Sequence, residues 1–465
     1  MPLSTIPDDE GLSLLERNAQ GLFTEALKAS WIKIFSARPQ LKNFLARSSA
    51  LTLEQYGSSL FTAESKISTT LSTLISSKVT KLFGDAAGAR AATSLTRLSN
   101  IDTSSHGGIF SEDTTVQSHL IIASGATTHQ STALVSLACG VVPMNNATWP
   151  RGFFRRGERE SLLPKSYDRV AMHECGAFTK AHLIKRLSDS SLDSCTKKIY
   201  GIIEQVPHLF EQQYFYEQVS LINATLWQQG CTMSGVTDFY HLLLEDISAA
   251  LVIKSIEDND ALSQLIFCEQ DRAQLLELFA NLPGTWSLDK KKGTFLFWAS
   301  TGDFRAASVW PSADGTHLIT AKRTIPYTAD AIKAALISKE LVPSVFLSLV
   351  SLLSHGVRPS GGYHQIAYLP EYGARLESFA KDRQSVRCPR FLGQMQTADL
   401  FQLGYGFTFI KDALSRTDFA GIDALICEPL SREEYQRQLS KTTVAASLVN
   451  NTKRLFAEIV PKHQQ

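Results

Sequence analysis

Three short polar segments hold the side chains best suited to chemistry, and each of them follows an apolar run. They are His106-Gly107-Gly108, the loop at residues 145–151 and the turn at residues 361–365. Glycine lets the backbone approach a ligand closely, and histidine exchanges protons near neutral pH. We therefore predict that an active site, if the chain has one, gathers these three segments.

His106 stands directly before two glycines and shortly before Ser111, a suitable N-cap for a helix. Free backbone N–H groups and the helix dipole favour an anion at such a place. His106 could donate a hydrogen bond to that anion or act as a general acid or base, and Gly107 and Gly108 would bind substrate through their backbone. The alternative is that the two glycines only permit a tight turn.

The loop at 145–151 combines amide groups, an aromatic ring and a guanidinium after a buried strand. Such a set of groups can orient a small polar substrate. We assign Asn145 to catalysis, Asn146 and Trp149 to substrate binding, and Arg151 to a clamp on a carboxylate or phosphate, since a guanidinium can donate two parallel hydrogen bonds. Each of these residues taken alone also fits an ordinary polar loop.

The turn at 361–365 follows the same logic, because paired glycines precede side chains that could face a pocket. We assign His364 to catalysis, Gln365 and the nearby Tyr368 to substrate binding, and Gly361 and Gly362 to a cofactor. The alternative is a tight turn that leads to an edge strand.

Several well-known site motifs are missing from the sequence. There is no P-loop, no dinucleotide-binding glycine motif, no zinc-protease helix, no nucleophile elbow and no EF-hand loop. His173, Glu174 and Cys175, with His182, could suggest a metal site, but consecutive helical residues point in different directions. We therefore expect no metal.

The order of the polar segments resembles one family, bacillithiol synthase, the bacterial enzyme that joins cysteine to a glucosamine-malate conjugate. In that family a Gly-rich turn enters a helix, a strand leads to a polar loop, and an apolar segment with a proline precedes a Gly-Gly turn. His106-Gly107-Gly108 and the segments 142–151 and 341–368 follow this order, so the resemblance covers roughly a third of the chain. Where the family has a Gly-Gln-Gln turn and an Asp-His-Asp loop, this chain has His-Gly-Gly and Asn-Asn-Ala-Thr-Trp-Pro. The resemblance implies a Rossmann-like core with helical insertions and a small-molecule joining reaction.

The elements around these segments predict an α/β fold: a Rossmann-like parallel-sheet core, large helical insertions and a small antiparallel meander. A short strand near 98–101, a helix from Ser111 and an apolar strand at 133–142 give the order of a βαβ unit, whose sheet binds ligands at the carboxyl ends of its strands. The expected regions are an N-terminal helical region at 1–100, the first part of the core at 101–160, a helical insertion at 161–283, the meander at 284–328, the second part of the core at 329–430 and a C-terminal helix at 431–465.

Apolar periodicity also predicts individual helices and strands. One helix should run from Leu15 to Phe35 and stop before Pro39, and another from a capping box at Thr52 to Gly84. Further helices are expected at 210–227, 238–256, 261–282 and 341–353, and strands at 294–299, 304–310 and 317–321.

The charge balance and the apolar content of the chain bear on which partners it can bind and where it is located. The chain has 46 Lys and Arg against 45 Asp and Glu, so it lacks the basic surplus that nucleic acid or an anionic membrane requires. No segment reaches the roughly 18–20 apolar residues that span a bilayer. The N-terminus has no basic region typical of a signal peptide. The seven scattered cysteines argue against a disulfide framework, and therefore predict a reducing, cytoplasmic location.

These observations favour a cytoplasmic biosynthetic enzyme of ligase or transferase type that condenses an amino-acid-like amine with a second small metabolite. The cofactor is unknown, and a nucleotide in the α/β core is one alternative. The expected partners are small-molecule substrates and a second copy of the chain, joined through long helices. The competing class is a non-catalytic small-molecule-binding or assembly protein whose helical arms dock a partner.

Overall fold

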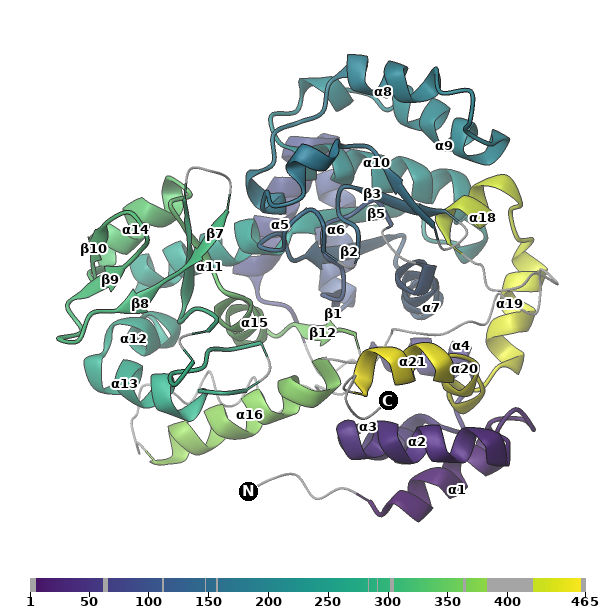
Figure 1. The fold of residues 1–465 in the computed structure, drawn as a ribbon, viewed down its shortest axis with the longest axis horizontal. Coiled ribbons are helices and arrows are strands. Elements are labelled where there is room, and N and C mark those ends of the chain that lie inside the picture. Colours follow the sequence, from purple (N-terminus) through teal and green to yellow (C-terminus); the bar gives the residue numbers. More distant parts are fainter. Residues whose placement is uncertain are drawn as a thin grey trace.

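The computed structural model describes residues 6–460 except 62–65, 111–112, 147, 156–157, 283, 291, 302–304, 363–364 and 383–420. Its central feature is a four-stranded parallel sheet with the strand order β12-β1-β2-β5 (Figure 1). The strands are β1 (Asn100–Asp102), β2 (Ala133–Ala138), β5 (Asp238–Leu243) and β12 (Arg358–Ser360). The predicted fold class, a Rossmann-like parallel core among many helices with small antiparallel sheets, is confirmed.

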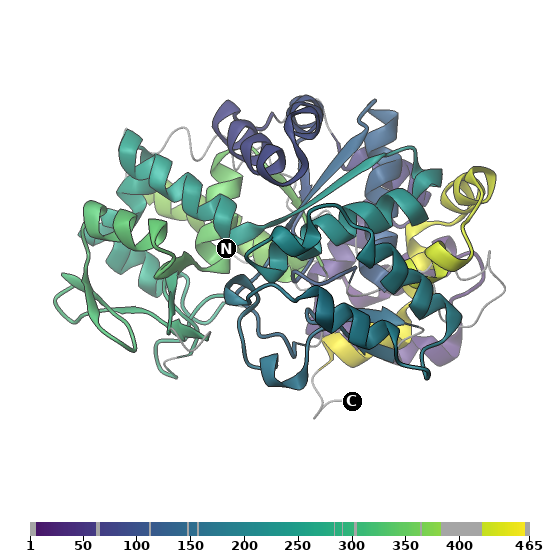
Figure 2. The same cartoon turned by 90° about the horizontal axis from the view of Figure 1, so that it is seen from above.

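Helices cover both faces of this sheet, which explains why β2 and β5 are buried along their whole length (Figure 2). One face packs against α5 (Thr69–Phe83), α6 (Asp85–Arg97) and the first turns of α11 (Leu244–Asp258). The other face packs against α7 (Asp113–Thr128) and α10 (Phe215–Gly230). The sheet is therefore the middle layer of a three-layer sandwich.

A second unit with its own hydrophobic core lies beside the sheet, on the left in Figure 1. It contains two three-stranded antiparallel sheets, β11-β6-β7 and β10-β9-β8. Their strands are β6 (Phe297–Ser300), β7 (Ala306–Ser308), β8 (Trp310–Pro311), β9 (His317–Ile319), β10 (Thr324–Pro326) and β11 (Leu341–Pro343). Its helices are α12 (Ala261–Phe267), α13 (Glu269–Leu278), α14 (Ala329–Ile337), α15 (Val345–Ser354) and α16 (Gln365–Asp382). Helix α11 contributes to this core as well as to the core of the sheet.

The two ends of the chain pack together, as the purple and yellow helices of Figure 1 show. The indole of Trp31 donates to the hydroxyl of Thr452 over 2.9 Å, and Thr52 forms a β-bridge with Thr443. The helices involved are α1 (Asp8–Asn18), α2 (Glu25–Ala37), α3 (Gln40–Ser48), α4 (Leu53–Ser59), α19 (Arg432–Lys441), α20 (Val444–Asn450) and α21 (Thr452–Ile459).

The long N-terminal helices predicted from periodicity are each broken. The first becomes α1 and α2, separated where Gln20 and Gly21 have positive φ. The second begins at the predicted capping box of Thr52 and ends at Gly84, but α4 stops at Ser59 and α5 starts at Thr69. The predicted C-terminal helix is likewise three helices, α19 to α21. Both ends are thus packed bundles of short helices.

Two predicted helices contain strands instead. Residues 238–243 form β5 rather than the first turns of a helix, because all six are buried and pair with β2 in register. Leu341–Pro343 forms β11 against β6, and the helix starts only at Val345, capped by Ser344. The predicted helix at 261–282 divides into α12 and α13 at Cys268. The predicted single meander is split between the two antiparallel sheets.

Two cysteines are joined, which the scattered cysteine pattern did not predict. Cys195 of α9 (Ser194–Glu204) forms a disulfide with Cys427 of α18 (Ile422–Cys427), 232 residues later. This pair could not be predicted from cysteine spacing, because the two cysteines meet only after folding. In the described part of the chain, no helix has the length and apolar character needed to cross a membrane.

Candidate small-molecule site at the sheet edge

The strand order creates a topological switch point at the carboxyl edge of the sheet. The chain proceeds from β1 to β2 to β5 in one direction, whereas β12 pairs with the opposite side of β1. Open α/β sheets bind ligands in the crevice where the order reverses, because the loops after the two strands on either side of the reversal leave in different directions. Here those loops begin at Thr103 and Gly361, and they meet where the side chain of Gln365 bonds to Thr103.

A cavity of about 390 Å³ lies at this edge, between the sheet and the second unit. This volume is in the range usual for small-molecule sites. The loops after β1, β2 and β5 provide one wall, with His106, Cys139 and Leu244. The second unit and the start of α16 provide the other, with Thr285, Thr294, Trp298, Ser344, Gln365 and Tyr368. Three of the residues predicted for a site, His106, Gln365 and Tyr368, therefore line one cavity.

Gln365 ties the two loops of the switch point together. Its side-chain amide donates to the carbonyl of Thr103 over 3.0 Å, and its amide oxygen accepts from the Thr103 hydroxyl over 3.0 Å. A Cβ at Gly361 would lie 1.7 Å from that amide oxygen, so only glycine leaves room for the interaction. Gln365 therefore braces the cavity wall as well as lining it.

The predicted glycines have structural reasons for their positions. Gly107 has φ +73°, and a Cβ there would come within 3.0 Å of Met172. Gly108 accepts from the side chain of Asn223, and Gly362 accepts from the backbone N–H of Gln365. These contacts fit the tight-turn alternative, and roles in binding a ligand or cofactor stay predictions. His364 lies outside the described residues.

None of the described residues of the loop at 145–151 lines the cavity. The backbone N–H of Asn145 donates to the carbonyl of Asp168, and the side chain of Asn146 accepts from Thr148. Arg151 is only 8% exposed and forms an ion pair with Asp168 at 2.5 Å. A guanidinium buried against its own carboxylate is occupied, which corrects its placement as a clamp at the common site.

The side chain of Trp149 also makes its contacts within the protein. Its indole N–H donates to the carbonyl of Glu160 in the hairpin of β3 (Gly152–Arg155) and β4 (Glu158–Ser161). The guanidinium groups of Arg151 and Arg159 lie 4.2 Å and 4.8 Å from the centre of a Trp149 ring. These cation–π contacts use the ring that the sequence suggested for stacking a substrate.

Cys139 and Glu245 are two residues of the cavity region that the sequence did not single out. The buried Glu245 carboxylate, at the start of α11, accepts from the backbone N–H groups of Gly140 and Val141 at 2.9 Å and 3.2 Å and from the Cys139 thiol at 3.4 Å. Burial raises the pKa of Glu245. Burial and the neighbouring Glu245 raise the pKa of Cys139 well above its usual value, so the thiol remains protonated at neutral pH. Cys139 is therefore poorly suited to be a nucleophile.

Asp102, the last residue of β1, forms a buried polar network beneath the loop of His106. One carboxylate oxygen accepts from the hydroxyl of Ser104 at 2.6 Å and from its N–H at 3.3 Å. The other accepts from the hydroxyl of Ser136 at 2.7 Å and lies 3.0 Å from Nε2 of His119. Burial alone would raise the pKa of Asp102, but His119 and the two hydroxyls lower it. The carboxylate is therefore ionised and fully hydrogen-bonded.

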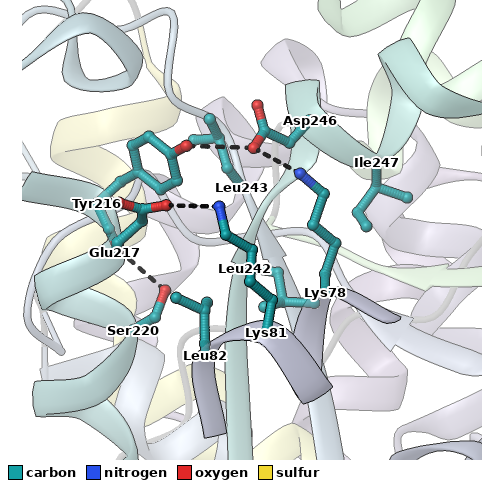
Figure 3. A pocket seen from close by; sticks show the side chains of 10 residues that line it. All are labelled: Lys78, Lys81, Leu82, Tyr216, Glu217, Ser220, Leu242, Leu243, Asp246 and Ile247. Carbon is teal, nitrogen blue, oxygen red and sulfur yellow. Dashed lines mark hydrogen bonds and ion pairs between the residues drawn. The ribbon is translucent and has the colours of Figure 1, made fainter. Parts of the chain in front are cut away.

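A second hollow, of only about 20 Å³, lies at the β5 end of the sheet (Figure 3). Asp246 accepts there from Lys78 at 3.1 Å and from the Tyr216 hydroxyl at 3.2 Å, and Lys339 of the second unit lies 3.3 Å away. Burial would raise the pKa of Asp246, but Lys339 and Lys78 lower it. Because its charges are already paired and it holds little more than a water molecule, this cluster ties helices together.

Comparisons with known proteins add no identification. No family model matches the chain, and no curated protein matches it. Among the described residues, no group of three His, Cys, Asp or Glu side chains is placed to hold a metal ion. The cavity at the switch point is therefore the feature of the molecule that bears on function.

Proposed function

We propose that the cavity at the switch point binds a small metabolite and that His106 transfers a proton in a reaction of that metabolite. The observation that carries this proposal is the convergence of His106, Gln365 and Tyr368 on one cavity at the sheet edge where α/β folds bind ligands. A histidine held in such a wall can accept or donate a proton near neutral pH.

The lining favours a ligand whose enclosed part is uncharged. Among the described residues that line the cavity there is no Lys, Arg, Asp or Glu side chain. Burial raises the pKa of Tyr368 and of Cys139, which keeps both groups neutral at neutral pH. Trp298 and Tyr368 offer aromatic surface. A charged group on the ligand would have to lie toward solvent or beside His106.

A nucleotide phosphate at the end of β2 is disfavoured. In many α/β sites, free backbone N–H groups after a strand bind phosphate. The N–H groups of Gly140 and Val141 already donate to the side-chain oxygens of Glu245, so a phosphate there would meet these oxygens in place of free N–H donors. Our proposal therefore assigns no nucleotide to this position.

The reaction class comes from the resemblance to bacillithiol synthase, and it remains a proposal. In a condensation of ligase or transferase type, the nitrogen of an amino-acid-like amine would bond to an electrophilic carbon of the second metabolite, and the bond from that carbon to its leaving group would break, with the electron pair going to the leaving group. His106 would accept the proton that this nitrogen must lose. A cytoplasmic location and a homodimer belong to the same proposal. The competing function is a binding protein with the same cavity and no turnover.

The test compares two histidine variants of the full chain. His106→Asn should abolish most retention of small molecules from a cell metabolite extract, measured by native mass spectrometry. The matched control is His208→Asn, which changes an exposed histidine with φ +57°, a conformation that asparagine tolerates. The same spectra report the oligomeric state. Equal retention by the parent and both variants would contradict the proposal.

A further inference from the structure

The segment that carries His106 is anchored at every residue between β1 and the histidine. Thr103 bonds to Ser360 and Gln365 on the β12 side. Ser105 accepts from the backbone N–H of Cys139 on the β2 side, at 2.9 Å. Ser104, between them, bonds with both its hydroxyl and its N–H to Asp102. The loop position of His106 is therefore fixed from two neighbouring strands and from below.

The anchor below the loop belongs to a row of polar residues that crosses three strands. Asp102 is in register with Ser136, and Ser136 with His241. His119 of α7 covers this row, and the ring of Phe239 lies 4.7 Å from the His119 ring. Asp102, Ser136, His119 and His241 are all buried, and none of them lines the cavity. These four residues could therefore affect a ligand in the cavity only through the loop that carries His106.

The charge in the row is concentrated on Asp102. A buried carboxylate is costly unless it is paired and hydrogen-bonded, and Asp102 meets both conditions through His119, Ser136 and Ser104. Burial and the nearby His119 lower the pKa of His241 to about 3, so His241 stays neutral and does not compete for the carboxylate. The bond to Ser104 is thus a hydrogen bond to a fixed negative charge.

We propose that Asp102 is the positioning residue of the site: its carboxylate holds Ser104 and thereby fixes the place of His106 in the cavity wall. This role rests on the proposed function of His106, although Asp102 itself touches no ligand. The hydroxyl of Ser104 is the contact that transmits the restraint, because it links the buried row to the loop.

A matched control exists elsewhere in the chain. Asp189 and Ser191 form the same turn, in which the serine hydroxyl donates to the carboxylate at 2.6 Å and the serine N–H at 3.0 Å. Ser191 is exposed, and the side chain of Asp189 is 38% exposed. Ser191→Ala therefore removes the same bond where no candidate site depends on it.

The experiment measures how fast diethyl pyrocarbonate modifies His106 in the full chain, read by peptide mass spectrometry. Ser104→Ala should raise this rate by about fivefold or more, because the loop loses a hydrogen bond to a charged group. Ser104→Thr should return the rate to that of the parent, since it restores a hydroxyl, and Ser191→Ala should leave it unchanged. Asp102→Asn, if it folds, should also raise the rate.

Unchanged reactivity of His106 in folded Ser104→Ala would overturn the proposal, as would failure of Ser104→Thr to restore it. The measurement needs no ligand, so it is separate from the test of the proposed function. If His106→Asn still retains small molecules while Ser104→Ala alters the reactivity of His106, the function fails and the positioning contact stands.

Discussion

The turn Asp-x-Ser occurs at Asp102–Ser104 under the cavity and at Asp189–Ser191 on the surface, with the same hydroxyl–carboxylate distance of 2.6 Å. The pKa of both carboxyls is lowered, but for different reasons. At Asp189 the bonds from Ser191 lower it in open solvent. At Asp102 they act together with His119 against the cost of burial. The local motif therefore fixes the geometry of the turn, whereas burial decides whether the turn contributes to the stability of the fold.

The largest expected difference between the two turns is in stability. Asp102→Ala should cost about 3 to 5 kcal/mol in the free energy of unfolding, because it leaves His119 buried without its carboxylate partner. Asp189→Ala should leave the free energy of unfolding close to that of the parent, as is usual for a surface substitution. Urea unfolding of the two variants measures both values. Similar losses of stability in the two variants would contradict this prediction, because the buried network would then contribute no more than the surface turn.

The surface region that follows Asp189 in the chain is stabilised in a different way, by the disulfide that joins Cys195 to Cys427. Cys427→Ser should cost about 2 to 4 kcal/mol under oxidising conditions, because the cross-link restricts the unfolded chain. The control is Cys268→Ser, at a free and partly exposed cysteine. A urea midpoint of the parent that does not change on adding dithiothreitol would contradict this prediction. Isolation of the protein with both thiols reduced would instead support the proposed cytoplasmic location.

The pH dependence of the buried row gives the smallest expected effect. The folded protein keeps His241 neutral until about pH 3, whereas the unfolded chain binds a proton below about pH 6.5. The stability contributed by the neutral ring is therefore complete above pH 6.5 and declines as the pH falls, by about 1.4 kcal/mol per pH unit. The lowered pKa of Asp102 acts only in more acidic solution, so the two effects separate.

His241→Gln should remove about 2 kcal/mol of the stability difference between pH 6.5 and pH 5. Urea unfolding at several pH values measures this difference. His208→Asn, at the exposed histidine, should leave the parent's pH dependence as it is. A parent protein equally stable at pH 6.5 and pH 5 would contradict the prediction.

Apolar patterns in the sequence predicted some of the helices and strands correctly and missed others. The apolar run at 133–142 was predicted to be a strand buried on both faces, and its first six residues, 133–138, form β2. Strand β5 was missed because Asp238 to Leu243 continues into α11 without a break, so the run looks like one helix. At both ends of the chain, the apolar periodicity predicted helices that are too long. Each predicted helix is broken into shorter ones, and packing of the N-terminal helices on the C-terminal ones permits these breaks.

The candidate site was predictable where backbone geometry marked it. Glycines near His106 and Gln365 indicated polar turns, and the structure brings His106 and Gln365 to one cavity. Trp298 and Thr294 could not be predicted, because they reach the cavity only through the packing of the second unit on the sheet edge. Arg151 looked available from its loop alone, since its partner Asp168 lies beyond an intervening hairpin.

Helix α11 belongs to both hydrophobic cores, and this has a mechanical consequence. Its first turns pack under the sheet edge, while Val252 further along lies in the core of the second unit. The two units therefore cannot separate without removing part of α11 from one of the two cores. The ion pair between Lys339 and Asp246 joins the units at the first turn of this helix. Because the side chain of Asp246 is only 15% exposed, salt would screen this pair less than it screens a pair on the surface.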